Sequence, residues 1–262
     1  MKISICGKGG SGKSVFTALM AMALKERGYR VLVVDSDESN YGLFRLLGFP
    51  HPPVPFMEMV GGKRSIKERM PIKASTQATE SKGEILPHDG LGIDDIPHQY
   101  RLENDHLFLV SIGKISQSLE GCACPMGVLT REFLKKLRLL PNEAVLVDME
   151  AGVEHFGRGV ETSIDGVVVV VEPSMESLEL AVRVKTLAQE AGVKKAWVVL
   201  NKIPSDDLAL TMKEELRGKG IELTGQIHYD PEIFKACLKG RKLEGGIAAK
   251  DVSAIIDLLM VA

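Results

Sequence analysis

The chain has 262 residues, of which 45% are hydrophobic and 26% are charged, with a formal net charge of −2 at pH 7. This is the composition of a globular protein that is long enough to bury a substantial core. The slightly acidic balance argues against general binding to nucleic acids or anionic membranes. The longest apolar run, residues 166–171, is far too short to span a bilayer. We therefore expect neither nucleic-acid nor membrane partners.

The N-terminus and the cysteines indicate the cellular location that we expect for the protein. The chain enters its first predicted strand directly, which leaves no room for a signal peptide. It has four cysteines, and Cys6 ends that predicted buried strand. A disulfide framework is not expected, and the predicted location is a reducing cytoplasm.

Short β-rich runs alternate with helical segments along the whole chain. This order predicts one α/β domain over residues 1–262, with a doubly wound, mostly parallel sheet of about seven strands and helices on both faces. The predicted strands are Lys2–Cys6, Arg30–Asp35, His106–Ile112, Ala144–Asp148, Gly166–Glu172, Lys195–Asn201 and Glu222–Ile227. The predicted helices are Lys13–Arg27, Val128–Leu140, Ser174–Ala191, Asp206–Lys219 and Asp251–Leu259.

Residues 61–101 interrupt this rhythm with many polar residues and scattered Gly and Pro. A structureless connection of this length is uncommon in a compact domain, so we predict an irregular insertion with a short helix near residues 66–70. A functional insertion and a plain surface excursion both stay open.

The clearest motif follows the first strand, where residues 7–14 match the phosphate-binding pattern G-x-x-x-x-G-K-[ST]. Its glycines allow backbone N–H groups to turn toward a polyphosphate, and a helix starting near Lys13 adds its positive dipole end. Lys13 is placed to reach the β- and γ-phosphates, and the Ser14 hydroxyl to bind Mg²⁺. The predicted nucleotide contacts in this loop are Gly7, Lys8, Gly9, Gly10, Ser11, Gly12, Lys13, Ser14 and Val15.

Carboxylates follow two further strands that should end at the same edge of the sheet. Asp35 and Asp37 stand at the end of the second strand, in the crevice where doubly wound sheets bind ligands. Asp148 ends four apolar residues, which is the arrangement of a Mg²⁺-holding acid. We therefore predict Ser14, Asp35 and Asp148 around Mg²⁺. Gly152 is expected to bring a backbone N–H to the γ-phosphate.

Together, the loop with its additional lysine at position 8, the Asp35-Ser36-Asp37 run and the segment from Asp148 to Gly152 resemble the deviant Walker A ATPases. That group includes septum-site, plasmid-partition, nitrogenase iron-protein and metallochaperone branches. The resemblance implies a homodimer in which Lys8 reaches the phosphates of the partner's ATP. It also implies that Asp37 orients or deprotonates the attacking water, so that Lys8, Lys13 and Asp37 are the predicted catalytic residues.

The choice of base is indicated by Asn201 and Lys202, which are followed by Pro204 where GTPases carry the guanine-reading aspartate. Without that carboxylate, adenine is favoured, and ATP is the predicted nucleotide. The resemblance implies that the Asn201 amide contacts the adenine. It implies the same for the later segment that contains Asp230 and Pro231.

A pair of cysteines, Cys122 and Cys124, lies between the third strand and the next helix. Two thiols at this spacing supply half of a tetrahedral soft-metal site, and two-fold symmetry would supply the other half from a second subunit. The alternative is that two small residues simply fill a loop.

The context of the pair resembles the nickel-insertion ATPases of carbon monoxide dehydrogenase maturation, the CooC family. The matching residues are Glu58-Met59, Cys122 and Cys124, and the Ala-Gly-x-Glu-His run over 151–155. The resemblance implies a metallochaperone that holds Ni²⁺, or Zn²⁺ in its place, between two subunits. Its client would be a carbon monoxide dehydrogenase or an acetyl-CoA synthase, and the sequence does not separate the two.

Two other functions stay open at this point. An iron–sulfur carrier or reductase of the nitrogenase iron-protein type could use four thiolates at a dimer interface, although that group uses cysteines far apart in sequence. A MinD/ParA-like positioning ATPase is the other, although the C-terminal residues 250–262 lack the basic amphipathic character of a membrane anchor. Cys237, at helical spacing with Ile233 and Phe234, is predicted to pack in the core.

Overall fold

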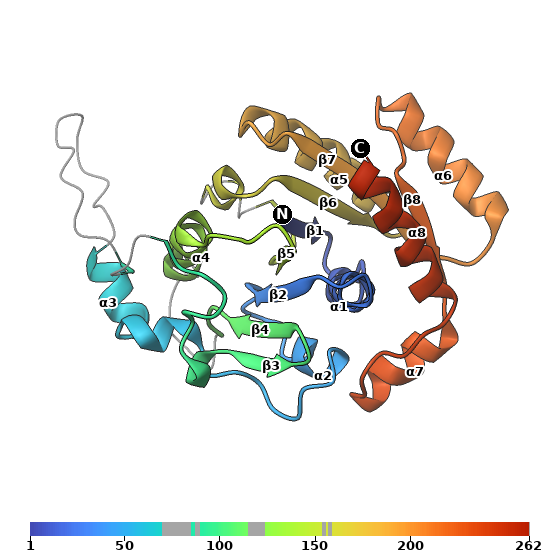
Figure 1. The fold of residues 1–262 in the computed structure, drawn as a ribbon. Helices are drawn as coiled ribbons and strands as arrows, with labels where there is room; N and C mark the ends of the chain where they lie inside the picture. Colours follow the sequence, from blue (N-terminus) through green and yellow to red (C-terminus); the bar gives the residue numbers. More distant parts are fainter. Residues whose placement is uncertain (70–84, 87–89, 115–123, 154–155, 157–158, 262) are drawn as a thin grey trace, which may run out of the picture.

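The computed structural model describes residues 1–69, 85–86, 90–114, 124–153, 156 and 159–261. Within these ranges the chain forms an eight-stranded sheet in the order β3-β4-β2-β5-β1-β6-β7-β8, with helices on both faces (Figure 1). All neighbouring strands run parallel except β3 and β4. The predicted α/β, doubly wound fold is confirmed.

The bounds of the elements follow the predicted alternation closely. The strands are β1 (Lys2–Gly7), β2 (Arg30–Asp35), β3 (Leu102–Asn104), β4 (Leu107–Ser111), β5 (Glu143–Asp148), β6 (Gly166–Val171), β7 (Lys195–Ile203) and β8 (Gly225–His228). The helices are α1 (Lys13–Glu26), α2 (Leu43–Leu46), α3 (Gly62–Arg69), α4 (Cys124–Lys136), α5 (Met175–Glu190), α6 (Asp206–Gly218), α7 (Pro231–Lys239) and α8 (Ile247–Val261).

Several predicted bounds were wrong, each for a local reason. The expected count of about seven strands missed β3, a short edge strand that turns into β4 through Asp105 and His106, both with positive φ. Helix α4 begins at Cys124 and not at Val128, with Pro125 in its first turn, where a missing N–H costs no hydrogen bond. Helices α2 and α7 were not predicted.

The sheet separates two hydrophobic layers, and the strand residues alternate between them. Leu32 and Val34 of β2 pack in the layer with α3, α4, α5 and α6, whereas Val31 and Val33 pack in the layer with α1, α2, α7 and α8. Because both faces are covered, the central strands are apolar throughout. The polar residues that matter for function are therefore restricted to the ends of the strands.

The described parts of residues 61–101 contribute to the core of the protein. Ile66 of α3, Ile93 and Ile96 are buried in the layer that contains α4. Leu91 also forms a parallel bridge with Leu137, at the end of α4. The predicted short helix exists, but it occupies 62–69.

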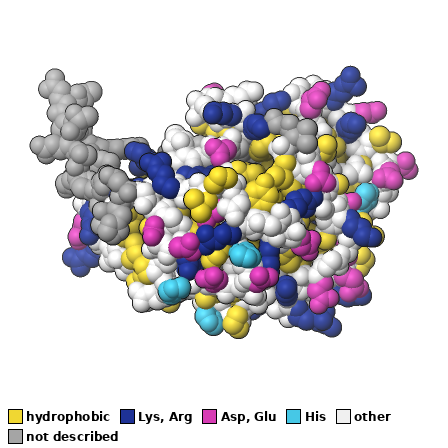
Figure 2. All heavy atoms as spheres, in the orientation of Figure 1, with side chains coloured by type: hydrophobic (Ala, Val, Ile, Leu, Met, Phe, Trp, Pro, Cys, Tyr) yellow, Lys and Arg dark blue, Asp and Glu magenta, His cyan; other side chains and the backbone are white. Residues whose placement is uncertain are grey.

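No helix in the described part of the chain has the length and apolarity to cross a membrane. On the face that Figure 2 draws, acidic and basic side chains are interspersed, without one large basic field.

Candidate functional site

The phosphate-binding loop connects β1 to α1 and is held tightly against its neighbours. Gly12 has a φ of 95°, and a Cβ at this position would collide with the Asn201 amide. Gly7 has a φ of 146°, and a Cβ there would collide with the Val170 carbonyl of β6. Only glycine fits at these two positions. The loop is therefore shaped by close backbone packing against β6 and β7.

Lys13 begins α1 inside this loop and is nearly inaccessible to solvent, with 6% of its surface exposed. Its Nζ lies 3.3 Å from the Lys8 carbonyl oxygen, so the ammonium group is folded back over the loop. A buried cation beside backbone N–H groups at a helix N-terminus forms a strong anion site. This geometry is suited to a polyphosphate.

Two of the three predicted carboxylates meet where their strands end. Asp35 of β2 and Asp148 of β5 are paired in register, and Asp148 is also paired with Ile5 of β1. The Ser14 hydroxyl donates to Asp148 Oδ2 at 2.6 Å, and the Thr17 hydroxyl lies 3.3 Å from Oδ1. The second strand, the phosphate loop and the fifth strand therefore converge on one group of oxygen atoms.

Burial makes these carboxylates hard to ionise without a cation. Desolvation, reinforced by the charge of Asp35, raises the pKa of Asp148 to about 7. Desolvation also raises the pKa of Asp35 to about 6, against the opposing effect of Lys114. Hydroxyl and carboxylate oxygens are the ligands that Mg²⁺ prefers. Ser14 and Asp148 fit such an ion, which would relieve the repulsion between the buried charges.

The other predicted acids have partners of their own. Lys114 Nζ lies 2.7 Å from Asp35 Oδ1, so Asp35 already has a counter-ion. Asp37 Oδ1 accepts hydrogen bonds from the backbone N–H and the hydroxyl of Ser39, at 2.9 and 2.7 Å. Asp37 is 7% exposed and is fixed in a tight turn after β2.

The side chain of Lys8 is turned toward two carboxylates outside the phosphate loop. Its Nζ is 3.7 Å from Glu172 and 3.6 Å from Glu176, and its side chain is 39% exposed. Glu172 also pairs with Lys202 at 3.3 Å. In the single chain, the ammonium group of Lys8 is thus turned toward an acidic pair at the start of α5.

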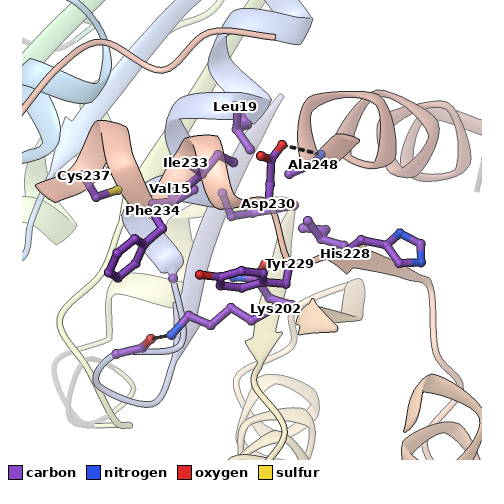
Figure 3. A pocket seen from close by; sticks show the side chains of 15 residues that line it. Val15, Leu19, Lys202, His228, Tyr229, Asp230, Ile233, Phe234, Cys237 and Ala248 are labelled. Carbon is purple, nitrogen blue, oxygen red and sulfur yellow. Dashed lines mark hydrogen bonds between the residues drawn. The ribbon is translucent and has the colours of Figure 1, made fainter. Parts of the chain in front are cut away.

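A cavity of about 280 Å³ opens beside the phosphate loop, between α1, α7 and the start of α8. Figure 3 shows Val15 and Leu19 from α1 at this cavity, with Phe234 from α7 and with Tyr229, which follows β8. The apolar lining suits a flat aromatic base. Its lining residues are Gly10, Gly12, Val15, Phe16, Leu19, Asn201, Lys202, Ile227, His228, Tyr229, Asp230, Ile233, Phe234, Cys237 and Ala248.

The residues predicted to contact the base lie at this cavity, although not all of them line it. Asn201 donates from Nδ2 to the Ser11 carbonyl at 2.8 Å, and Lys202 donates to the Gly10 carbonyl. Asp230 accepts from the N–H groups of Glu232 and Ala248, at 2.9 and 3.3 Å. Pro231, in the first turn of α7, is exposed and is not part of the lining.

Two further predicted features can be placed. The Gly152 N–H donates to the Gly7 carbonyl at 3.3 Å, which puts the start of the segment after β5 against the phosphate loop. Cys237 is exposed and lines the cavity, so the prediction that it packs in the core was wrong. Helix α7 buries only Ala236, and its apolar spacing does not correspond to a buried face.

Of the two cysteines of the C-x-C pair, only Cys124 lies among the described residues. Cys124 is the first residue of α4 and is partly buried, whereas Cys122 lies outside the described residues, as do Glu154 and His155. Within the described ranges, no three His, Cys, Asp or Glu side chains are grouped as metal ligands.

Sequence reasoning missed Lys114, Thr17 and Asn40, which complete the polar group around Ser14 and Asp35. Asn40 Nδ2 donates to the Ser14 hydroxyl at 2.5 Å. Lys114 follows a strand that ends at the same edge as β2, and this was the available signal. Its partner Asp35 lies 79 residues earlier, which no local motif connects.

The fold and this site define a P-loop ATPase, and comparison with known proteins agrees. Residues 3–243 match the CobQ/CobB/MinD/ParA nucleotide-binding domain, and the chain belongs to that family. A MinC:MinD complex from Aquifex aeolicus matches with a TM-score of 0.70 at 19% identity, over 100% of this chain and 96% of that one. MinD with Mg-ADP from Pyrococcus horikoshii matches with a TM-score of 0.67 at 18% identity, over 98% and 95%. Likeness at such identities shows the fold alone.

Sequence comparison goes further within the family. An uncharacterised ATP-binding protein of Methanocaldococcus jannaschii is 41% identical over 99% of both chains. The carbon monoxide dehydrogenase accessory protein CooC of Rhodospirillum rubrum is 35% identical over 90% of this chain and 86% of its own. The resemblance to the CooC-type branch is thereby confirmed.

Proposed function

We propose that the chain is an ATP-hydrolysing, dimeric metallochaperone. It would carry Ni²⁺, or Zn²⁺ in its place, on Cys122 and Cys124 and deliver the ion to a nickel enzyme such as carbon monoxide dehydrogenase or acetyl-CoA synthase. The observation that carries this proposal is the 35% identity with CooC over 90% of the chain. The C-x-C pair gives that identity a chemical basis, because two thiolates from each of two subunits make a soft tetrahedral site.

The nucleotide half of the proposal rests on the geometry of the phosphate loop. Lys13 and the loop N–H groups would hold the phosphates, with the base in the apolar cavity beside Val15. Ser14 and Asp148 would hold Mg²⁺, which would neutralise charge on the β- and γ-phosphates. Asp37, fixed by Ser39, would orient the attacking water and accept its proton.

The dimer that would join the two halves of the proposal rests on Lys8. In the single chain its ammonium group lies near Glu172 and Glu176 at distances beyond a direct hydrogen bond, and it is partly exposed. Exposed ion pairs of this kind contribute little free energy. Lys8 would therefore leave these carboxylates at low cost for the phosphates of a partner's nucleotide. Hydrolysis would then depend on assembly, because the compensating charge arrives from the second subunit.

The metal half of the proposal is tested by titrating the reduced protein with Ni²⁺ under anaerobic conditions, against a chromophoric competitor. A Cys122→Ser/Cys124→Ser variant should bind Ni²⁺ more than about 100-fold more weakly than the wild type, because both soft ligands of each chain are removed. Cys237→Ser removes an exposed cysteine outside the pair and serves as the matched control, with binding unchanged. If the double variant binds as tightly and in the same stoichiometry as the wild type, the metallochaperone assignment is wrong.

A further inference from the structure

Lys114 has contacts to which the proposed chemistry assigns no role. Its Nζ donates to the Asp35 carboxylate at 2.7 Å and to the backbone carbonyls of Asp37 and Asn40. These three hydrogen bonds match the three N–H donors of an ammonium group. The side chain is 13% exposed, and the ring centroid of Tyr41 lies 5.7 Å from Nζ. One cation therefore binds the end of β2 and the loop after it at three points.

The backbone that carries Lys114 is held by the sheet. Strand β4 pairs with β2 to the end of both strands, and the next N–H, that of Ile112, donates to the Asp35 carbonyl at 2.9 Å. Ile112 is fully buried. Gly113 is packed so closely that a Cβ there would lie 2.5 Å from Met57 Sδ. Lys114 therefore extends from a part of the chain that is fixed on both sides by packing and pairing.

The three acceptors of Lys114 belong to different parts of the nucleotide site. Asp35 ends β2, at the edge of the sheet where Mg²⁺ is expected. Asp37 is the residue to which we assign the activation of water. Asn40 donates from Nδ2 to the hydroxyl of Ser14, the proposed Mg²⁺ ligand in the phosphate loop, at 2.5 Å. A displacement of Lys114 would therefore move all three parts together.

The carboxylate of Asp37 is oriented within its loop, whereas its backbone is fixed from outside. Oδ1 accepts from the N–H and the hydroxyl of Ser39, at 2.9 and 2.7 Å. Both bonds lie inside the loop, so they set the direction of the carboxylate and not the place of the loop against the sheet. The bond from Lys114 to the Asp37 carbonyl joins the loop to the end of β4. Activation of water tolerates little displacement of the base, because the base must lie within hydrogen-bond reach of the proton that it accepts.

We propose that Lys114 is a positioning residue for ATP hydrolysis, which holds residues 35–40 so that the Asp37 carboxylate reaches the attacking water. This inference rests on the role proposed for Asp37, and it is independent of any metal that the protein carries to a client. Lys13 and the N–H groups of the phosphate loop bind the phosphates in this account. Loss of Lys114 should therefore lower the rate of hydrolysis and leave the binding of ATP nearly unchanged.

The first test is steady-state hydrolysis of ATP with Mg²⁺ and without nickel. Lys114→Met should lower kcat about 10- to 100-fold and leave KM within about threefold of the wild type. Lys114→Arg keeps a cation beside Asp35 and should restore part of kcat; it also serves for the same comparisons should Lys114→Met fail to fold. Lys2→Met is the matched control, because Lys2 also donates to two backbone carbonyls, those of Leu134 and Leu137, at the opposite end of β1 from the phosphate loop. A wild-type kcat in Lys114→Met would overturn the inference.

A double-mutant cycle shows whether Lys114 acts through Asp37. Lys114→Met/Asp37→Ala should hydrolyse ATP at the same residual rate as Asp37→Ala alone, because a residue that acts only by placing Asp37 has no effect once that carboxylate is gone. Single-turnover hydrolysis of radiolabelled ATP measures both rates. If Lys114→Met lowers the rate by the same factor in both backgrounds, Lys114 acts independently of Asp37 and the inference is wrong.

Hydrogen exchange measures the position of the loop without any hydrolysis. The N–H groups of Ser39 and Gly42 are bound within the loop, at 2.9 and 2.8 Å. In Lys114→Met, a peptide over residues 36–42 should exchange about tenfold faster, while peptides from β1 and β5 keep their protection. Unchanged exchange over this peptide, or equally faster exchange throughout the chain, would overturn the inference. Normal hydrolysis by Asp37→Ala together with a local loss of protection in Lys114→Met would instead refute the role of Asp37 and leave the positioning of the loop.

Discussion

The three carboxylates at the nucleotide site are chemically distinct because their neighbours differ. Asp148 meets hydroxyl groups, Asp35 meets the Lys114 ammonium, and Asp37 accepts from the backbone and hydroxyl of Ser39. Their positions could be predicted because each follows an apolar strand at a known edge of the sheet. The partner of Asp35 could not, since Lys114 is brought in by the fold from 79 residues further along the chain.

Replacement of Asp37 tests its assignment as the residue that activates water. Asp37→Ala should lower the rate of ATP hydrolysis by about 100- to 10,000-fold, because general-base assistance is lost. Binding of ATP should change little, since Asp37 is not placed on the phosphates. Phosphate release and calorimetric titration measure the two effects. Asp257→Ala, at an exposed ion pair with Arg27, is the control, and normal hydrolysis by Asp37→Ala would refute the assignment.

Among the elements, α7 shows that apolar residues at helical spacing do not by themselves indicate a buried face. Helix α7 has apolar residues at helical spacing, yet Phe234 and Leu238 are 58% and 75% exposed. Spacing alone cannot tell a buried stripe from one that faces a cavity.

One side chain binds the N-terminal ends of both α7 and α8. Asp230 accepts hydrogen bonds from the Glu232 N–H in α7 and from the Ala248 N–H in α8.

This shared cap makes Asp230 a structural residue of the base cavity. Asp230→Ala should lower the free energy of unfolding by about 1–2 kcal/mol per cap lost. Urea denaturation followed by circular dichroism measures this loss. Glu232→Ala, in the same turn but exposed, should cost far less. Equal stability of the two variants would show that Asp230 does not hold the helix ends.

A histidine in strand β8, His228, pairs with carboxylates of α6 and α8, and the strength of this pairing depends on its protonation. His228 lies 2.9 Å from Asp251 of α8 and 3.3 Å from Asp206 of α6. Hydrogen bonds to Asp251 and then to Asp206 raise its pKa above the ordinary value of 6.5. The imidazolium form therefore stabilises the fold below that value, and this stabilisation is lost as the pH rises through the raised pKa.

A comparison with His228→Gln isolates this contribution. The stability advantage of the wild type over the variant should be present at about pH 5 and should disappear by about pH 9. Urea unfolding at the two pH values measures the difference. An advantage that is the same at both values would show that the ion pairs do not contribute.

At the scale of the whole molecule, the chain order of elements was enough to predict a doubly wound sheet, because alternating βα units have few ways to cover both faces. The homodimer was expected only from the resemblance to the deviant Walker A ATPases, and it stays a prediction. In the single chain Lys8 lies near Glu172 and Glu176, and under the proposed function a metal site built from Cys122 and Cys124 would be complete only with two subunits. The central claim is thus that ATP and the metal are held by one dimer.

The mass and metal content of the ATP-bound protein test this claim most directly. The reduced Asp37→Ala variant, loaded with ATP, Mg²⁺ and Ni²⁺, would be passed through size-exclusion chromatography with light scattering, and its fractions analysed for metal. The account predicts a dimer that contains one Ni²⁺ for two chains, which a second Lys8→Ala substitution converts into monomers. One Ni²⁺ for each chain in a monomeric peak, or a dimer indifferent to both ATP and Lys8, would contradict it.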